Sequence, residues 1–125
     1  MKKHVISTPG APSAIGTYSQ AIRVGNLLFA SGQIGLDPET MKLRDSFKGQ
    51  VVQIFSNISE ICLQAGGSLD SVVKLTVFLK SMEDFGELNV IMKDFFKKPF
   101  PARSAVGISE LPMKAAVEVE AIIAL

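Results

Sequence analysis

The stretch SVVKLTVFLKS, residues 71–81, places β-branched and apolar residues on both faces of an extended chain. Successive side chains of a strand point to opposite faces, so odd-numbered positions share one face and even-numbered positions the other. The first face consists of Val73, Leu75, Val77 and Leu79, and the second of Val72, Thr76 and Phe78. A strand of this composition is predicted to lie inside a sheet and to be covered on both sides.

Helical patterns flank this strand. Before it, apolar residues recur three and four apart from Phe47 to Ala65, which predicts an amphipathic helix that starts at Ser46 and ends at the left-handed cap Gly66-Gly67. After it, a second apolar stripe predicts a helix that Pro99 stops. The first stripe consists of Phe47, Val51, Ile54, Phe55, Ile58, Ile61, Cys62 and Ala65, and the second of Phe85, Leu88, Met92 and Phe95, flanked by Ile91 and Phe96.

Further strands lie toward both ends of the chain. In QAIRVGNLLFASGQ, two apolar runs at 20–24 and 27–31 meet at Gly25-Asn26, which predicts a two-residue hairpin turn because both residues tolerate positive φ. LDPETMKLRD (36–45) is typical of a turn-rich loop. FPARSAVGISELP (100–112) and AAVEVEAIIAL (115–125) predict two more strands, and HVIS (4–7) a short additional one.

The order of these elements, β-β-α-β-α-β-β, predicts one α+β domain over residues 1–125, with a mixed sheet and both helices on one face. Two helices cover only one face of a sheet, so the apolar residues of the other face predict a second copy of the chain as cover. An apolar content of 47% and a mean hydropathy of +0.31 favour the same conclusion.

Charge and composition exclude several classes of function. Thirteen basic and twelve acidic residues give a net charge of +1, which argues against nucleic-acid or anionic-membrane binding. A single cysteine, Cys62, and a single histidine, His4, exclude an internal disulfide and argue against a metal site. No cofactor motif, signal peptide or membrane span is recognised, so we expect a cytoplasmic protein without metal or cofactor.

Arg103 is the first candidate site residue. Strand alternation gives it the small neighbours Ala105 and Gly107 on its own face, so the side chain has space around it. It is either a solvated edge residue or the floor of a pocket where a guanidinium binds a small carboxylate through two hydrogen bonds.

Glu118 and Glu120 share one face of the last strand. The pattern is typical of a solvent-facing polar stripe, but Ile122 continues the same face. A carboxyl group beside apolar neighbours could instead have a raised pKa and transfer protons. Tyr18, in GTYSQA, and Ser31-Gly32, in ASGQ, are each explained by packing or a strand-ending turn, or by contact with a ligand.

The chain resembles the RidA/YjgF family of reactive intermediate deaminases over essentially its full length. The resemblance rests on GTYSQA (16–21), LLFASGQIGLDPET (27–40), NISEICLQAGGSLDSVVKLTVFL (57–79), PARSAV (101–106) and VEVEAIIAL (117–125). It implies a chorismate-mutase-like fold and a homotrimer with ligand clefts between subunits. It also implies hydrolysis of short 2-imino or enamino acids, such as 2-aminoacrylate, 2-iminopropanoate and 2-iminobutanoate, to 2-oxo acids and ammonia, which protects pyridoxal-phosphate enzymes from these intermediates.

The same resemblance assigns roles to residues. Arg103 matches the family's carboxylate-binding arginine and Glu118 its water-contacting glutamate, while other residues match positions that line the same cleft: Tyr18, Ser31, Gly32 and Asn89. Many members have a cysteine where this chain has Ala105. A thiol-dependent mechanism is therefore excluded here.

Two alternatives to the deaminase remain. A non-catalytic module could bind a 2-oxo acid or another small carboxylate through Arg103 alone. RNA cleavage has been attributed to some relatives, but the near-neutral charge, one tyrosine and no tryptophan argue against an RNA groove.

Overall fold

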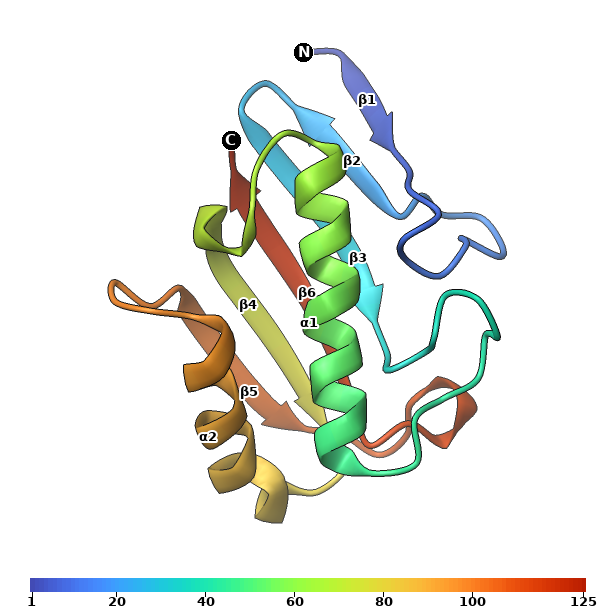
Figure 1. Cartoon of the computed structure of the whole chain (residues 1–125), viewed down its shortest axis with the longest axis vertical. Helices are drawn as coiled ribbons and strands as arrows, with labels where there is room; N and C mark the ends of the chain where they lie inside the picture. The colour runs from blue at the N-terminus through green and yellow to red at the C-terminus, as the bar shows by residue number, and fades with distance from the viewer.

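Six strands form one mixed sheet in the computed structural model of the chain, which describes residues 1–125 (Figure 1). The strands are β1 (Lys3–Ile6), β2 (Ala21–Val24), β3 (Leu27–Gln33), β4 (Val72–Leu79), β5 (Ala102–Gly107) and β6 (Val117–Ala124). The helices are α1 (Phe47–Gln64) and α2 (Phe85–Phe95), with short 3-10 turns at Leu69–Ser71, Met82–Asp84 and Pro112–Lys114.

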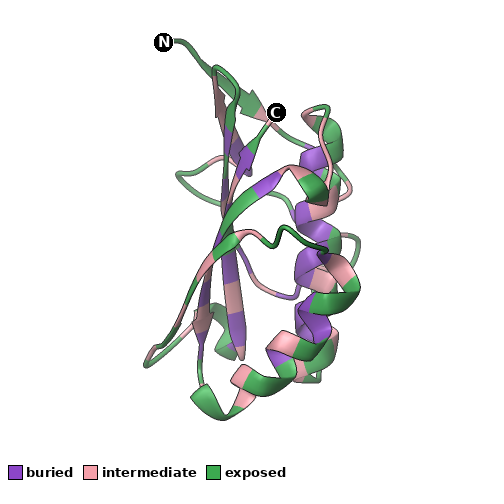
Figure 2. Ribbon diagram, turned by 90° about the vertical axis from the view of Figure 1, so that its left-hand side faces the viewer, coloured by how far each residue is buried: buried purple, intermediate pink, exposed green.

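The strand order is β1-β2-β3-β6-β4-β5, so the last strand of the chain lies inside the sheet. Only β4 and β5 are parallel, and α2 makes the crossover between them. Both helices lie on one face, as the view turned by 90° in Figure 2 shows, with the buried residues between helices and sheet. The predicted α+β architecture is confirmed, including the small N-terminal strand.

The ends of α1 form for the predicted reasons. The Ser46 hydroxyl accepts a hydrogen bond from the Gly49 N–H, which satisfies one of the free donors of the first turn. At the other end Gly66 has a φ of 91°, and the Gly67 N–H donates to the Cys62 carbonyl at 2.8 Å, as in a Schellman motif. Neither helix has the length and apolar character that a membrane span requires.

The hairpin between β2 and β3 also follows the prediction, with a difference at its turn. Val24 pairs with Leu27 across two turn residues, of which only Gly25 has a positive φ, 60°. This is the pattern of a type II′ turn. The strand that follows is longer than predicted, because Ser31 and Gly32 form a bulge opposite β6 instead of a strand-ending turn.

The predicted faces of β4 are wrong at its start. A register shift between Val72 and Lys74 buries Val72 in the core at 6% exposure and leaves Val73 45% exposed. The extra residue of the bulge reverses the alternation before it. Beyond the bulge one face of β4 is buried beneath the helices, whereas Thr76 and Phe78 on the other face are only partly buried. Within one chain β4 is therefore not covered on both sides.

The face of the sheet away from the helices keeps apolar side chains in contact with solvent. Leu27 is 43% exposed, and Phe29 and Val106 are each 44% exposed. Phe29 pairs with Ile122 across β3 and β6, while Val106 and Glu118 flank Phe78 on either side. This open face is the one for which the sequence predicts a second copy as cover.

Candidate functional site

The Arg103 side chain lies between the sheet and α2. Arg103 pairs with the fully buried Leu75 of β4, so its side chain points to the helix-covered face. Its Nη1 donates to the Asn89 Oδ1 at 2.6 Å and lies 3.4 Å from the Met92 Sδ. The guanidinium carbon stands 5.0 Å from the centre of the Phe85 ring, a cation–π distance. Residues on about two turns of α2 thus fix the orientation of the arginine.

The charge of Arg103 has no acidic partner. The two ion pairs of the chain are Arg44–Asp37 and Lys97–Asp70. The hydrogen bonds of the guanidinium use Nη1 alone, so the edge formed by Nε and Nη2 is free. Arg103 and Asn89 line a cavity of about 520 Å³ between α2 and the segment at Phe100 and Pro101. A carboxylate can bind such an edge through two parallel hydrogen bonds.

The space around Arg103 has a different origin from the predicted one. Ala105 and Gly107 do share its face, because they pair with the buried Val77 and Leu79. Ala105, however, packs against the core, and a Cβ placed on Gly107 would lie 3.3 Å from the Met82 Cγ. The free volume lies instead along α2.

Glu118 occupies the opposite face of the sheet. It pairs with Phe78 of β4, one residue out of phase with the buried Val117 and Val119. Its carboxyl group lies over the bulge of β3, where a Cβ on Gly32 would stand only 2.8 Å from the Glu118 Cδ. Glu118, Gly32 and Tyr18 line a second cavity, of about 330 Å³. Glycine at 32 leaves the space that this carboxyl group occupies.

Burial raises the pKa of Glu118, and the negative charge of Glu120 raises it further. A carboxyl group whose pKa moves toward neutrality exchanges protons more readily near neutral pH. Glu118 is half-buried and therefore does not fit the predicted solvent-facing stripe, whereas Glu120 is exposed and fits it.

The segment that carries Tyr18 is held by polar contacts. Tyr18 is 52% exposed and its hydroxyl oxygen accepts from the Ile15 N–H at 3.4 Å, so it is not a core packing residue. The Ser31 hydroxyl donates to the Ser19 carbonyl at 2.6 Å, and Ser31 is not among the residues that line the cavity. Through this hydrogen bond Ser31 holds the segment that carries Tyr18 against β3.

Gln20 holds the same segment and was missed in the sequence. It is 4% exposed, and its Nε2 donates to three carbonyl oxygens, those of Thr8, Ala11 and Pro12, while its Oε1 accepts from the Thr8 N–H. A glutamine at the start of an apolar strand, in GTYSQA, is the signal that could have indicated a buried polar clamp.

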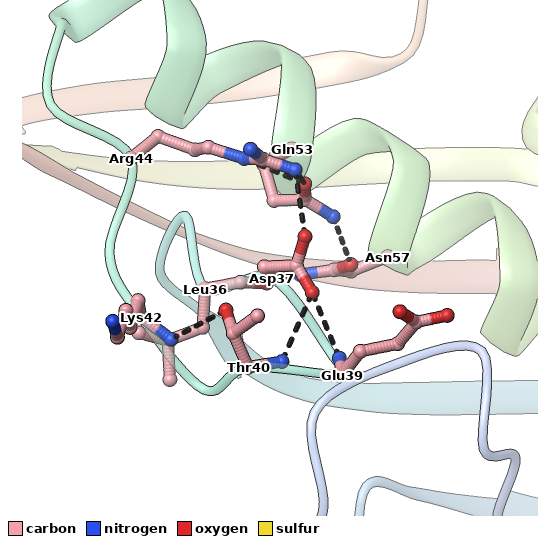
Figure 3. A network of polar contacts seen from close by, with 8 residues as sticks. All are labelled: Leu36, Asp37, Glu39, Thr40, Lys42, Arg44, Gln53 and Asn57. Carbon is pink, nitrogen blue, oxygen red and sulfur yellow. Dashed lines mark hydrogen bonds and ion pairs between the residues drawn. The ribbon is translucent and has the colours of Figure 1, made fainter.

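The loop between β3 and α1 forms another wall of the Glu118 cavity, through Leu36 and Met41. Figure 3 shows the polar network that holds it. The fully buried Asn57 of α1 donates to the Leu36 carbonyl at 3.0 Å and accepts from the Gln53 Nε2 at 2.8 Å. Arg44 joins the Gln53 Oε1 to Asp37, with 2.8 Å between its Nη2 and the Asp37 Oδ2.

The predicted turn-rich loop does turn at Asp37-Pro38, and Asp37 also joins this network. The Asp37 Oδ1 accepts from the N–H groups of Glu39 and Thr40. The hydrogen bond from Thr40, followed by that from Glu39 and then by the charge of Arg44, lowers the pKa of Asp37. The loop therefore carries a charged anchor on its outer side.

The predicted site residues form two groups on opposite faces of the sheet. Asn89 and Arg103 meet on the helix-covered face. Tyr18, Gly32 and Glu118 meet on the open face. One chain therefore does not bring Arg103 and Glu118 into a common cavity, as the resemblance had implied.

The chain is similar to known proteins both in sequence and in structure. A family model described as Endoribonuclease L-PSP matches residues 8–125. A 2-iminobutanoate/2-iminopropanoate deaminase of Dermatophagoides farinae is 43% identical, covering 98% of this chain and 97% of that protein. A RutC family protein of Aquifex aeolicus is 49% identical, covering 92% and 94%. The crystal structure of RidA from Psychrobacter sp. PAMC 21119 matches with a TM-score of 0.96 and 49% identity, covering 98% of this chain and 99% of that one.

Proposed function

The chain belongs to the Endoribonuclease L-PSP family, which is the RidA/YjgF family, and from this premise we propose that it hydrolyses short 2-imino acids to 2-oxo acids and ammonia. The substrates are 2-iminopropanoate, the tautomer of 2-aminoacrylate, and 2-iminobutanoate. The activity is that of a 2-iminobutanoate/2-iminopropanoate deaminase, as the relative from Dermatophagoides farinae is named. The observation that carries the proposal is Arg103 itself: it lines a cavity of about 520 Å³, its Nε and Nη2 make no hydrogen bond within the chain, and it has no acidic partner.

Arg103 binds the substrate carboxylate in this proposal. Asn89 occupies Nη1, which leaves Nε and Nη2 to donate two hydrogen bonds to the two carboxylate oxygens. Phe85 lies against the guanidinium and keeps the fork from rotating away. Holding the carboxylate also places the adjacent imine carbon, because the two carbons are bonded to each other.

Glu118 moves the protons. The carbon of an iminium group is already electrophilic, so no nucleophilic side chain is needed. The Glu118 carboxylate takes a proton from a water molecule as the water oxygen bonds to the imine carbon. It then returns this proton to the nitrogen of the tetrahedral intermediate. The carboxylate next accepts the remaining hydroxyl proton as the carbon–nitrogen bond breaks, so that the carbon–oxygen double bond forms, ammonia leaves, and the proton passes to ammonia. The raised pKa of Glu118 suits these transfers.

The two half-sites meet between copies of the chain in this proposal. Arg103 and Glu118 lie on opposite faces, so the Arg103 cavity of one copy must face the Glu118 cavity of another. A head-to-tail interface joins different surfaces in this way, and it closes into a ring when the rotation allows, whereas a two-fold interface joins identical surfaces. A homotrimer is the ring that the family resemblance implies. The exposed Leu27, Phe29 and Val106 supply apolar area for its contacts.

A coupled assay tests the activity. A pyridoxal-phosphate enzyme that consumes threonine releases 2-iminobutanoate, and the appearance of 2-oxobutanoate is timed with and without this protein. We expect the protein to accelerate the reaction, and we expect Arg103→Ala to abolish the acceleration while the thermal unfolding transition remains cooperative. Spontaneous rates in the presence of the wild-type protein would contradict the proposal.

The carboxylate-binding module is the second candidate. It is favoured by the arrangement of the Arg103 cavity, which within one chain is complete for carboxylate binding without Glu118. A titration with 2-oxobutanoate separates the two functions. A wild-type protein that binds 2-oxobutanoate through Arg103 but accelerates no hydrolysis would be the module, and Glu118→Gln would then leave its only property unchanged.

A further inference from the structure

Lys93 lies in the same cavity as Arg103, and the proposed reaction does not use it. The cavity of about 520 Å³ is lined by two cationic side chains and no acidic one. Lys93 follows Asn89 by four residues on α2, so both lie on the same side of the helix, with Lys93 about 6 Å farther along its axis. Because Asn89 contacts Arg103, the two cations lie at successive positions along one groove.

No carboxylate of the chain neutralises Lys93. The two ion pairs join Arg44 to Asp37 and Lys97 to Asp70. A lysine in the last turn of a helix interacts favourably with the helix dipole, but any position of that turn would serve this purpose. The position of Lys93 is distinguished by the cavity it shares with Arg103.

The cavity combines two cationic side chains with apolar walls, which suits a ligand that has two negative charges joined by an apolar chain. Apolar groups of Met92, Phe100 and Pro101 complete the lining. A ligand with one carboxylate at Arg103 uses one of the two cations only. A ligand with two carboxylates joined by a short methylene chain places its charges on the two cations and its methylene groups on the apolar walls. The flexible four-carbon stem of lysine allows the ammonium group to follow the second carboxylate.

We propose that Lys93 binds the distal carboxylate of dicarboxylic 2-imino acids such as 2-iminoglutarate, and so adds a second substrate class to the Arg103 site. This inference rests on the proposed deaminase function. The chemistry at the imine carbon is the same hydrolysis, with Lys93 as a specificity-determining residue that does not touch the reacting atoms.

Ligand binding tests the role of Lys93 without using turnover. Titrations with 2-oxoglutarate and 2-oxobutanoate compare the wild type, Lys93→Gln and the control Lys48→Gln, which removes an exposed lysine on α1. We expect Lys93→Gln to weaken 2-oxoglutarate binding by roughly two- to fivefold, as for a partly exposed ion pair, and to leave 2-oxobutanoate binding unchanged. Lys48→Gln should change neither. Equal effects of Lys93→Gln on both ligands, or no effect, would overturn the inference.

Turnover distinguishes this inference from the function on which it rests. A glutamate oxidase supplies 2-iminoglutarate and the threonine enzyme supplies 2-iminobutanoate. We expect Lys93→Gln to lower the acceleration of 2-iminoglutarate hydrolysis selectively. If the wild type accelerates the hydrolysis of 2-iminobutanoate but not that of 2-iminoglutarate, only the role of Lys93 is overturned. The same holds if Lys93→Gln changes the two accelerations by the same factor. Loss of both accelerations in the wild type overturns the deaminase.

Discussion

Gly32 determines where the Glu118 carboxyl group can lie. A Cβ at this position would stand 2.8 Å from the Glu118 Cδ and 3.0 Å from its Oε1, closer than unbonded atoms approach. We expect Gly32→Ala to displace the carboxyl group and to lower the acceleration of 2-iminobutanoate hydrolysis about tenfold or more, because misplacement by an ångström weakens catalysis strongly.

The control for this substitution is Gly86→Ala. A Cβ at Gly86 meets no atom within 4 Å, and the residue lies in the first turn of α2, where alanine is favoured over glycine by up to about 1 kcal/mol. Gly86→Ala should keep full activity and unfold at a slightly higher temperature. Full activity of Gly32→Ala as well would show that the position of Glu118 does not matter.

Glu120 adjusts the pKa of Glu118 from two residues away. Burial is the larger cause of the raised pKa, and the charge of Glu120 is the second. In the proposed mechanism Glu118 acts as a base in its ionised form, so activity should rise with pH as Glu118 loses its proton. Glu120→Gln removes the repulsion, lowers the pKa of Glu118 and should move the acid limb of the pH–activity profile to lower pH. A profile that keeps its position would mean that another group controls the rate.

Asn57 connects helix α1 to the loop at residues 35–45. This side chain is fully buried, and its partners are the Leu36 carbonyl and the Gln53 amide. We expect Asn57→Ala to lower the free energy of unfolding by about 1–3 kcal/mol, because it leaves buried polar groups without partners. Urea unfolding measures this, with the exposed Ser56→Ala on the same helix as control.

The same substitution should also affect the site. Leu36 and Met41 line the Glu118 cavity, so a loosened loop changes its wall. Asn57→Ala should therefore weaken activity more than binding of 2-oxobutanoate at Arg103, which lies on the other face of the sheet. An equal loss of both would indicate global destabilisation.

For the whole molecule, the separation of the half-sites makes a prediction about mixed assemblies. Arg103→Ala and Glu118→Gln should each be inactive alone. When the two variants are unfolded together and refolded as a mixture, some sites combine an intact Arg103 from one copy with an intact Glu118 from another. Random assembly should restore about a quarter of the wild-type activity.

The result can be interpreted only if the mixture assembles like the wild type. Size-exclusion chromatography must show the same assembly for the mixture and the wild type. A mixture as inactive as its components would show that both residues act from one chain, contrary to their positions on opposite faces.

Local patterns determined the elements of this fold and most of their ends. Helical stripes, the Ser46 cap, the Gly66 cap and the Gly25 turn depend on residues close in the sequence, so one sequence suffices to predict them. The faces of β6 were predicted correctly because Val117 and its odd-numbered companions differ strongly in polarity from Glu118 and Glu120. The residues expected to share one cleft line two cavities in the single chain, Tyr18, Gly32 and Glu118 the one and Asn89 and Arg103 the other, and their roles stay predictions.

Only the tertiary structure decided which face of β5 meets the helices. Ala105 and Gly107 on one face differ little in hydrophobicity from Ser104 and Val106 on the other, so alternation cannot choose between them. Parallel pairing with β4 and the contact of Arg103 with α2 make that choice. The bulges at 72–74 and 31–32 also depend on tertiary structure, because each is a shift in the pairing of its strand with β6. The sequence by itself thus determined the parts and the chemical groups, whereas strand pairing decided that Arg103 and Glu118 lie on opposite faces.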